Sequence, residues 1–420
     1  MNIIFKKNLK HFLIATIVVG FHLSLATIVL GNDFEVSAEH AIAIEVQTGK
    51  VLYEKDAKKR DGIASMTKLL TAYLVLKEIK QGGLTLSDDV PISDDAYALT
   101  QNHALSNVPL DKRHYSVEDL LKATLVASSN SAAIALAEHI SGTEAQFVDL
   151  MKAQLATWDI HDVKLINASG LPNTFLKHRL YPGSQISDEN EMSAQDVAKM
   201  AMHLIEEFPE ILLITKEPYV FFDGSAIQSF NHLLPGMSAA RETVDGLKTG
   251  TTTFAGQCLV TSSIENGMRI ITVIMNADNA ENDADARFHA SDNLLTHIAT
   301  TYRKETLVQK GQVIPNKKLA IINGKEKSIS VYAEQPVSVI TSDKDPHQSS
   351  KDLLLSPTTS EAPIEHRQRV GYVTVSPLSK KERFLKQPYK IPIRAAKAVS
   401  KAPFPVIWWQ KIVRFINEQL

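Results

Sequence analysis

Residues 64–71 read Ala64-Ser65-Met66-Thr67-Lys68-Leu69-Leu70-Thr71 and place a lysine three positions after a serine. The apolar residues that follow, as far as Ile79, have the spacing of a helix that begins at or just before Ser65. Positions three apart share a helix face, so the Lys68 amine can reach the Ser65 hydroxyl. Burial would lower the pKa of Lys68, and the neutral amine could then take the serine proton. Taken alone, the stretch also fits an N-cap serine beside a solvated lysine.

A second polar cluster interrupts the segment from Asp119 to Ile140, whose apolar residues otherwise have helical spacing. The interruption is Ser128-Ser129-Asn130, so we expect two helices with a break that turns Ser128 and Asn130 toward a cleft. Ser128 could relay a proton toward a leaving group, and Asn130 could hold the Lys68 amine or a substrate amide. Capping of the second helix explains the same residues when the other motifs are ignored.

A third cluster, Lys248-Thr249-Gly250, lies in a β-prone run from Val244 to Thr252. Glycine at 250 would let a ligand backbone approach the strand edge, so the strand could hold an extended peptide. Lys248 would supply positive charge, and Thr249 could donate a hydrogen bond to a substrate carboxylate. Two apolar runs follow, separated by Glu265-Asn266-Gly267, and Asn-Gly is a strong hairpin signal. The cluster therefore belongs to an antiparallel sheet, although a surface strand with a turn glycine is the plainer alternative.

The order of these clusters matches the S-x-x-K, S-x-N and K-T-G motifs of penicillin-binding proteins and serine β-lactamases. The flanks add to the match: Thr48-Gly49-Lys50-Val51-Leu52-Tyr53 precedes the serine, and Asp245-Gly246-Leu247 leads into the third motif, with Ala255-Gly256 after it. With these residues the chain resembles the D-alanyl-D-alanine carboxypeptidases, the low-molecular-weight penicillin-binding proteins. The resemblance runs from about Ala41 to beyond Leu295 and continues more weakly through the C-terminal region.

The resemblance implies a role for each motif residue. Ser65 would be the acyl-ester nucleophile, Lys68 its proton acceptor, and Ser128 with Asn130 the second element of the active site. The substrate-binding strand would carry Lys248, Thr249 and Gly250. The family's carboxylate-binding arginine would fall on Arg287 of Ala286-Arg287-Phe288, where a surface salt bridge is the alternative. The backbone N–H groups of Ser65 and of a residue near Thr251 would form the oxyanion hole.

The resemblance also implies the fold and the reaction. We expect an α+β chain with a penicillin-binding, β-lactamase-like catalytic domain, a small β-sandwich and a C-terminal amphipathic helix. Ser65 would attack the penultimate D-alanine carbonyl of a peptidoglycan stem pentapeptide and release the terminal D-alanine, and water would hydrolyse the acyl-enzyme. A β-lactam antibiotic would acylate the same serine and leave slowly. No cofactor or metal is expected, because no H-E-x-x-H motif or paired Cys/His spacing occurs and Cys258 is the single cysteine.

Composition changes along the chain predict four segments: 1–38 a signal peptide, 39–302 the catalytic domain, 303–379 a β-rich domain and 380–420 a basic amphipathic anchor. Three lysines precede an apolar run from Phe12 to Leu30, and Val36-Ser37-Ala38 offers a cleavage site. The apolar run is also long enough for an uncleaved membrane helix. Either arrangement places the enzyme outside the cytoplasm.

The last thirteen residues, Trp408 to Leu420, form a helical wheel with a broad apolar face that includes Trp408, Trp409 and Phe415. Lysines and arginines between 380 and 401 precede it. This helix is too short and too charged to span a bilayer, so we expect it to lie in the membrane interface on the outer face of a bacterial cell membrane. A helix docked on the protein is the alternative. The net charge of −2 argues against a nucleic-acid partner.

Three other functions share these motifs. A serine β-lactamase of the commonest class would carry an E-x-x-L-N glutamate between the second and third motifs, and the sequence has none. A catalytically silent, membrane-anchored wall-binding protein would keep the fold, but it would not need intact Ser65, Lys68 and Lys248. Endopeptidase activity on cross-links stays open, because the same site could support it.

Overall fold

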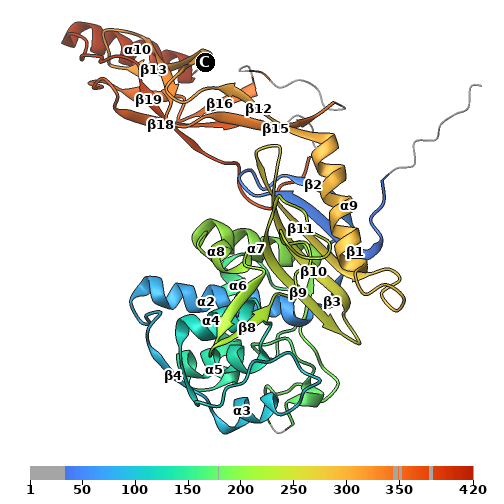
Figure 1. Cartoon of the computed structure of the whole chain (residues 1–420). Helices are drawn as coiled ribbons and strands as arrows, with labels where there is room; N and C mark the ends of the chain where they lie inside the picture. The colour runs from blue at the N-terminus through green and yellow to red at the C-terminus, as the bar shows by residue number, and fades with distance from the viewer. Residues whose placement is uncertain (1–33, 178, 344–348, 350–351, 378–381, 420) are drawn as a thin grey trace, which may run out of the picture. The chain divides into compact units, whose positions relative to one another are not determined.

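A computed structural model describes residues 34–177, 179–343, 349, 352–377 and 382–419. The predicted signal segment lies almost entirely outside these residues and stays a prediction. Within them the chain mixes helices and antiparallel sheets, which confirms the α+β class (Figure 1).

The centre of the catalytic part is a five-stranded antiparallel sheet. The predicted Asn266-Gly267 hairpin is present, and its two antiparallel strands pair with Leu259 opposite Ile274. Helix α9 (Ala286–Thr301) packs on one face and α7 (Ala194–Glu207) on the other (Figure 1). In spatial order the strands are β2 (Val51–Lys55), β1 (Ala38–Glu45), β11 (Met268–Ala277), β10 (Gly256–Glu265) and β9 (Val244–Thr252).

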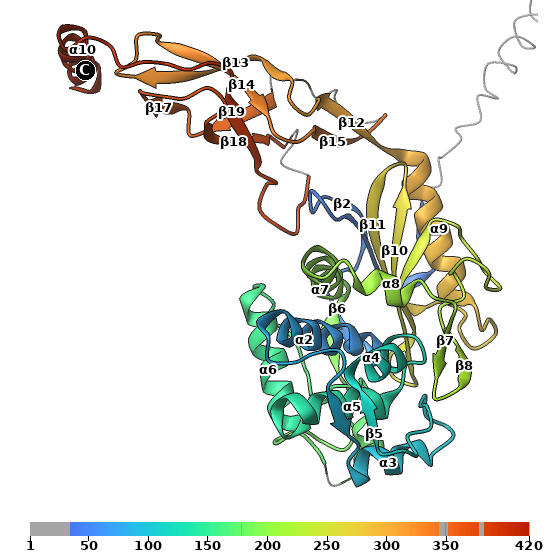
Figure 2. The ribbon, with the colours of Figure 1, turned by 60° about the vertical axis from the view of Figure 1, so that its left-hand side comes forward.

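A helical layer adjoins this sheet (Figure 2). At its centre α2 (Lys68–Gln81) has every residue from Lys68 to Leu76 buried, which is typical of a core helix and unusual for one that begins with lysine. Hydroxyl side chains cap the neighbouring helices, among them Ser129 at α5 and Thr143 at α6. The other elements of the layer are η1 (Ala64–Thr67), α3 (Asp94–Thr100), α4 (Val117–Leu125), α5 (Asn130–Ser141), α6 (Glu144–Thr157), η2 (Asn173–Phe175) and α8 (Ile211–Thr215).

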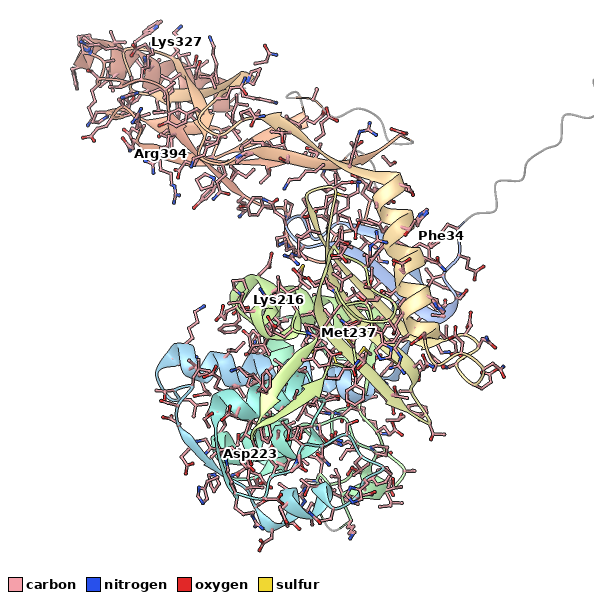
Figure 3. The ribbon with its side chains drawn as sticks, in the orientation of Figure 1. Phe34, Lys216, Asp223, Met237, Lys327 and Arg394 are labelled. Carbon is pink, nitrogen blue, oxygen red and sulfur yellow. The ribbon has the colours of Figure 1, made fainter. Side chains whose placement is uncertain are left out.

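Three short strand pairs lie outside the five-stranded sheet. Asp223, labelled in Figure 3, lies in the turn of one pair and forms an ion pair with Lys112. The pairs are β3 (Arg60–Gly62) with β6 (Glu191–Ser193), β4 (Asp89–Pro91) with β5 (His114–Ser116), and β7 (Tyr219–Phe222) with β8 (Ser225–Gln228).

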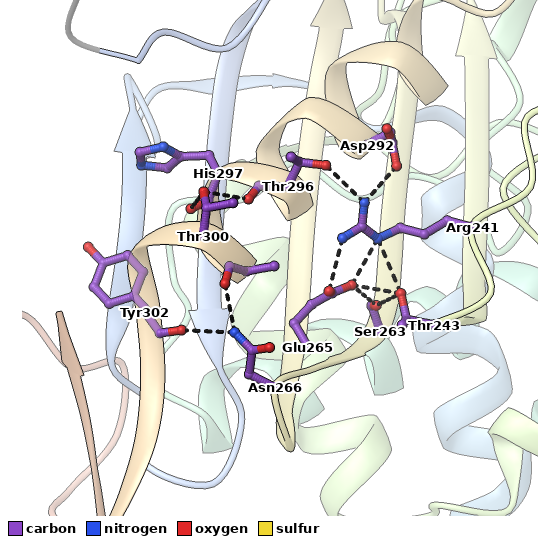
Figure 4. A network of polar contacts seen from close by, with 11 residues as sticks. Arg241, Thr243, Ser263, Glu265, Asn266, Asp292, Thr296, His297, Thr300 and Tyr302 are labelled. Carbon is purple, nitrogen blue, oxygen red and sulfur yellow. Dashed lines mark hydrogen bonds and ion pairs between the residues drawn. The ribbon is translucent and has the colours of Figure 1, made fainter. Parts of the chain in front are cut away.

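A polar network fixes the chain just before β9 (Figure 4). Arg241 donates two hydrogen bonds of 2.9 Å to the buried Glu265 carboxylate and one of 2.8 Å to Asp292 of α9. The Thr243 hydroxyl donates to the same Glu265 carboxylate at 2.7 Å. Bidentate pairing of this kind is directional, so it sets where β9 enters the sheet and hence where Lys248 lies.

The C-terminal part has its own apolar core, which includes Leu319, Val331, Val373 and Ile393. A two-stranded sheet and a six-stranded sheet build it. The predicted domain boundaries stay a prediction, but β19 belongs to the six-stranded sheet although it lies beyond residue 379. The strands are β12 (Tyr302–Val308) with β15 (Val337–Ser342), and in order β16 (Leu353–Ser356), β18 (Arg369–Val375), β19 (Ile391–Ala395), β14 (Ser328–Ala333), β13 (Val313–Ile322) and β17 (Thr359–Glu361).

The chain ends in α10 (Phe404–Gln419), the predicted amphipathic helix. Its apolar side chains face solvent, with Trp408 and Trp409 59% and 62% exposed. Among the described residues, no helix has the length and apolar character that crossing a bilayer requires.

Candidate active site

The side chains of Ser65 and Lys68 are in contact, as the sequence predicts. Ser65 lies in η1, and Lys68 begins the helix that continues from it. The Lys68 Nζ is 2.8 Å from Ser65 Oγ, and it donates to Asn130 Oδ1 at 2.7 Å and to the Ser169 carbonyl at 2.6 Å. A neutral amine has two N–H groups and one lone pair. With both N–H groups on Asn130 and Ser169, the lone pair points at the Ser65 hydroxyl.

The electrostatics favour that neutral amine. Lys68 is fully buried, and burial lowers its pKa well below the usual lysine range, with repulsion from Lys248 as a second cause. The described contacts of its Nζ include no carboxylate that would stabilise the charged form. A lysine in this setting can accept a proton, as a general base requires.

Ser128 and Lys248 form the second pair. Ser128 lies between α4 and α5 with a left-handed φ of +55°, a conformation that costs a non-glycine residue about 1–3 kcal/mol and that recurs at functional sites. Its Oγ accepts a 2.8 Å hydrogen bond from Lys248 Nζ, which also donates to the Thr249 carbonyl at 3.0 Å. Burial lowers the pKa of Lys248 to about 7, and Arg287 contributes by repulsion. Lys248 is therefore only partly charged at neutral pH.

Five of the predicted site residues line one cleft of about 260 Å³ that opens to solvent, namely Ser65, Ser128, Thr249, Gly250 and Arg287. Lys68 and Lys248 do not line it but contact it through Ser65 and Ser128. Gly250 is needed at the floor, because a Cβ there would lie 2.9 Å from the Ile63 carbonyl. Arg287 lines the cleft, but its Nη1 donates to the Gly250 carbonyl at 2.8 Å, so part of its guanidinium braces β9. The lining residues are Ser65, Ser106, Ser128, Phe230, His232, Thr249, Gly250, Thr251, Ala284, Arg287 and Phe288.

Several supporting residues were not predicted from the sequence. Asn190 joins η1 to the loop 166–170, because its Nδ2 donates to Thr67 Oγ1 at 3.0 Å and its Oδ1 accepts from the Ile166 N–H at 2.8 Å. Gly170, with φ +81°, is so close to the start of η1 that a Cβ would fall 1.9 Å from the Ala64 carbonyl oxygen. The cluster Asn167-Ala168-Ser169-Gly170 was visible as a turn, but no spacing rule connects it to Ser65.

One group of side chains could in principle hold a metal ion. Glu39, His40 and Asp61 have ligand atoms within 4.8 Å of one another, and none of the three lines the cleft. His40 Nε2 lies 3.2 Å from Asp61 Oδ2, and the buried His40 Nδ1 has no partner in the described part of the chain. A metal-bound histidine normally donates from its second nitrogen, so a hydrogen-bonded His–Asp pair describes this cluster better.

Comparisons with known proteins point to one family. The sequence model of D-alanyl-D-alanine carboxypeptidases matches residues 27–279, and that of the penicillin-binding protein 5 C-terminal domain matches residues 302–401. The D-alanyl-D-alanine carboxypeptidase DacC of Escherichia coli is 32% identical over 348 residues, and DacF of Bacillus subtilis is 30% identical over 344 residues. Each alignment covers 80% of this chain and 80% of the relative.

Solved structures agree with the sequence relatives. The crystal structure of a peptidoglycan synthesis regulatory factor (PBP3) from Streptococcus pneumoniae has a TM-score of 0.83 at 42% identity, and the match covers 87% of this chain and 100% of that chain. Penicillin-binding protein D2 of Listeria monocytogenes, crystallised in a cefotaxime-bound form, has a TM-score of 0.52 at 30% identity over 63% of this chain and 98% of its own.

Proposed function

Because this chain belongs to the D-alanyl-D-alanine carboxypeptidase family, we propose that Ser65 is the nucleophile of its reaction and Lys68 the base that activates it. The protein is a serine-type hydrolase that removes the terminal D-alanine from peptidoglycan stem peptides. The observation that carries the assignment is the 2.8 Å approach of the buried Lys68 amine to Ser65 Oγ.

The reaction has two steps. The Lys68 lone pair takes the Ser65 proton as Oγ attacks the penultimate D-alanine carbonyl, which gives an acyl-enzyme. Ser128, hydrogen-bonded to Lys248, supplies a proton path to the nitrogen of the departing D-alanine. Water then hydrolyses the ester, and D-alanine and the shortened peptide are the products. The N–H groups of Ser65 and Thr251 would stabilise the oxyanion of each tetrahedral intermediate.

Strand β9 would hold the substrate beside Ser65. Thr249 and Arg287 both line the cleft, where the Thr249 hydroxyl and the guanidinium can donate to the substrate's terminal carboxylate. Lys248 adds positive charge whenever it is protonated. A β-lactam carries a carboxylate next to its reactive amide, so it would enter the same cleft and acylate Ser65.

The experiment replaces Ser65 by alanine. The wild-type protein and Ser65→Ala are incubated with diacetyl-L-Lys-D-Ala-D-Ala, and D-alanine release is measured beside covalent labelling by fluorescent penicillin. We expect the wild type to give both signals and the variant to give neither, with the melting temperature preserved. Labelling retained in Ser65→Ala would move the nucleophile elsewhere. Rapid penicillin turnover without D-alanine release would favour a β-lactamase, and neither signal in the wild type would favour a silent wall-binding protein.

We also propose that α10 holds the enzyme at the outer face of the cell membrane. Its exposed tryptophans and Phe415 form an apolar surface that would enter the lipid interface. The basic residues before α10 support membrane binding less than the sequence suggested, because four of them form ion pairs with glutamates. The pairs are Arg383 with Glu54, Lys386 with Glu206, Arg394 with Glu334 and Lys397 with Glu326. The apolar face is therefore the main source of membrane affinity.

A further inference from the structure

Glu144 is a buried acid that the reaction above does not use. It begins α6, directly after the capping residue Thr143, and its Oε1 accepts a 3.0 Å hydrogen bond from the Ala168 N–H. Its Oε2 is buried without a hydrogen-bond partner in the described chain. Burial raises the pKa of Glu144 to about 7, which the Ala168 hydrogen bond and Arg179 partly oppose. Acids are rarely kept in such surroundings without a specific role.

The segment that Glu144 holds leads directly to the reacting groups. The Ala168 carbonyl accepts a 2.6 Å hydrogen bond from the Thr71 hydroxyl. The carbonyl of the next residue, Ser169, accepts a 2.6 Å hydrogen bond from Lys68 Nζ. The Glu144 contact is thus one residue away from the acceptor that orients Lys68. Gly170 then packs against the Ala64 carbonyl at the start of η1.

We propose that Glu144 is a positioning residue for Lys68. By fixing the Ala168 N–H it sets the place of the Ser169 carbonyl, and that carbonyl determines which way the Lys68 lone pair points. If the carbonyl shifts, a Lys68 N–H can turn toward Ser65 Oγ, and the amine then accepts the serine proton less well. The inference rests on the proposed roles of Ser65 and Lys68.

Three variants separate the hydrogen bond from the bulk of the side chain. Glu144→Gln keeps an oxygen that can accept from Ala168, Glu144→Ala removes it, and Glu144→Asp withdraws it by one methylene. The acylation rate constant and the apparent binding constant for fluorescent penicillin are measured on the folded fraction at pH 6. We expect Glu144→Ala and Glu144→Asp to lose about tenfold or more in the rate constant, since small misplacements of a catalytic group are costly. Binding should change little, and Glu144→Gln should stay within about twofold of the wild type.

The pH profile supplies a readout that lost stability would not imitate. The raised pKa means that the docked conformation prefers the protonated acid, so ionisation above about pH 7 should loosen the loop. The ratio of wild-type to Glu144→Gln acylation rates should therefore fall as the pH rises from 6 to 8. Lys68 and Lys248 titrate in both proteins and cancel in the ratio. The charged groups near Glu144 are Arg179 and its partners Glu138 and Asp95, which also stay in both proteins.

Glu118→Gln is the matched control, because Glu118 is exposed and forms its ion pair with Lys122 of the same helix. The ratio of the wild-type acylation rate to that of Glu118→Gln should not change with pH.

The proposal is overturned if Glu144→Ala and Glu144→Asp acylate at the wild-type rate, or if Glu144→Gln loses as much of the acylation rate as Glu144→Ala. Should Glu144→Ala not fold, the Asp and Gln variants decide. Loss of labelling in Ser65→Ala together with wild-type rates in the Glu144 variants would leave the nucleophile in place and remove only the role of Glu144.

Discussion

At the scale of single residues, two buried lysines share one site, and the pKa of each lies below the usual lysine value. Burial dominates for both, and each amine also feels a neighbouring cation, Lys248 for Lys68 and Arg287 for Lys248. In the proposed mechanism Lys68 has to be neutral to accept a proton, whereas Lys248 has to be charged to attract a carboxylate. The site can satisfy both only over a limited range of pH.

Burial lowers the pKa of Lys248 to about 7, which predicts an alkaline limit to the reaction. A base is protonated below its pKa, so the charge that draws the substrate carboxylate disappears as the pH rises through 7. We expect kcat/KM for the D-Ala-D-Ala peptide to fall above about pH 7, by up to about tenfold per pH unit. In Lys248→Arg the guanidinium stays charged, so the fall in kcat/KM above pH 7 should become shallower. The decline that remains is the one expected from ionisation of Glu144. An unchanged profile in Lys248→Arg would assign the limit to another group.

At the scale of elements, the site depends on close contact between a loop and a short helix. In Gly170→Ala the new methyl group would overlap the Ala64 carbonyl, and residue 170 has a positive φ that alanine rarely adopts. We therefore expect the unfolding free energy to fall by about 2–4 kcal/mol and the acylation rate to fall as well. Gly183→Ala is the matched control, because Gly183 has a similar φ of +83° and nothing within 4 Å of the added Cβ. It should cost about 1 kcal/mol from backbone strain alone. Urea unfolding measures both, and equal losses would show that η1 can move aside.

At the scale of the whole molecule, the catalytic site and the proposed membrane surface belong to parts with separate apolar cores. Removal of residues 404–420 should therefore abolish co-sedimentation with anionic vesicles and leave the rate of penicillin labelling unchanged. Trp408→Ala with Trp409→Ala should weaken vesicle binding about tenfold or more, because both rings are exposed. Lys411→Gln is a control for charge and should have a small, salt-dependent effect. Vesicle binding that survives the deletion would mean that another surface attaches the protein.

The sequence by itself predicted the fold class and the residues that we propose to react. Ser65 and Lys68 are three positions apart along continuous helical turns, so their contact is local. The Asn266-Gly267 pair predicts its hairpin because both residue types readily adopt the positive φ that the turn requires. Strand β9 and the break at Ser128 could likewise be predicted from short stretches. Family resemblance, and no local rule, was needed to bring these stretches together.

Only the tertiary structure decided what surrounds them. Asn190, Ser169, Gly170 and Glu144 act through contacts between residues far apart in the sequence, and a turn such as 167–170 carries no periodicity that names its partner. The pairing of the C-terminal cations with glutamates was equally invisible, since a charge pattern does not show which acids fold against it. Burial lowers the pKa of both lysines, and burial is a property of the packed molecule rather than of any segment of its chain.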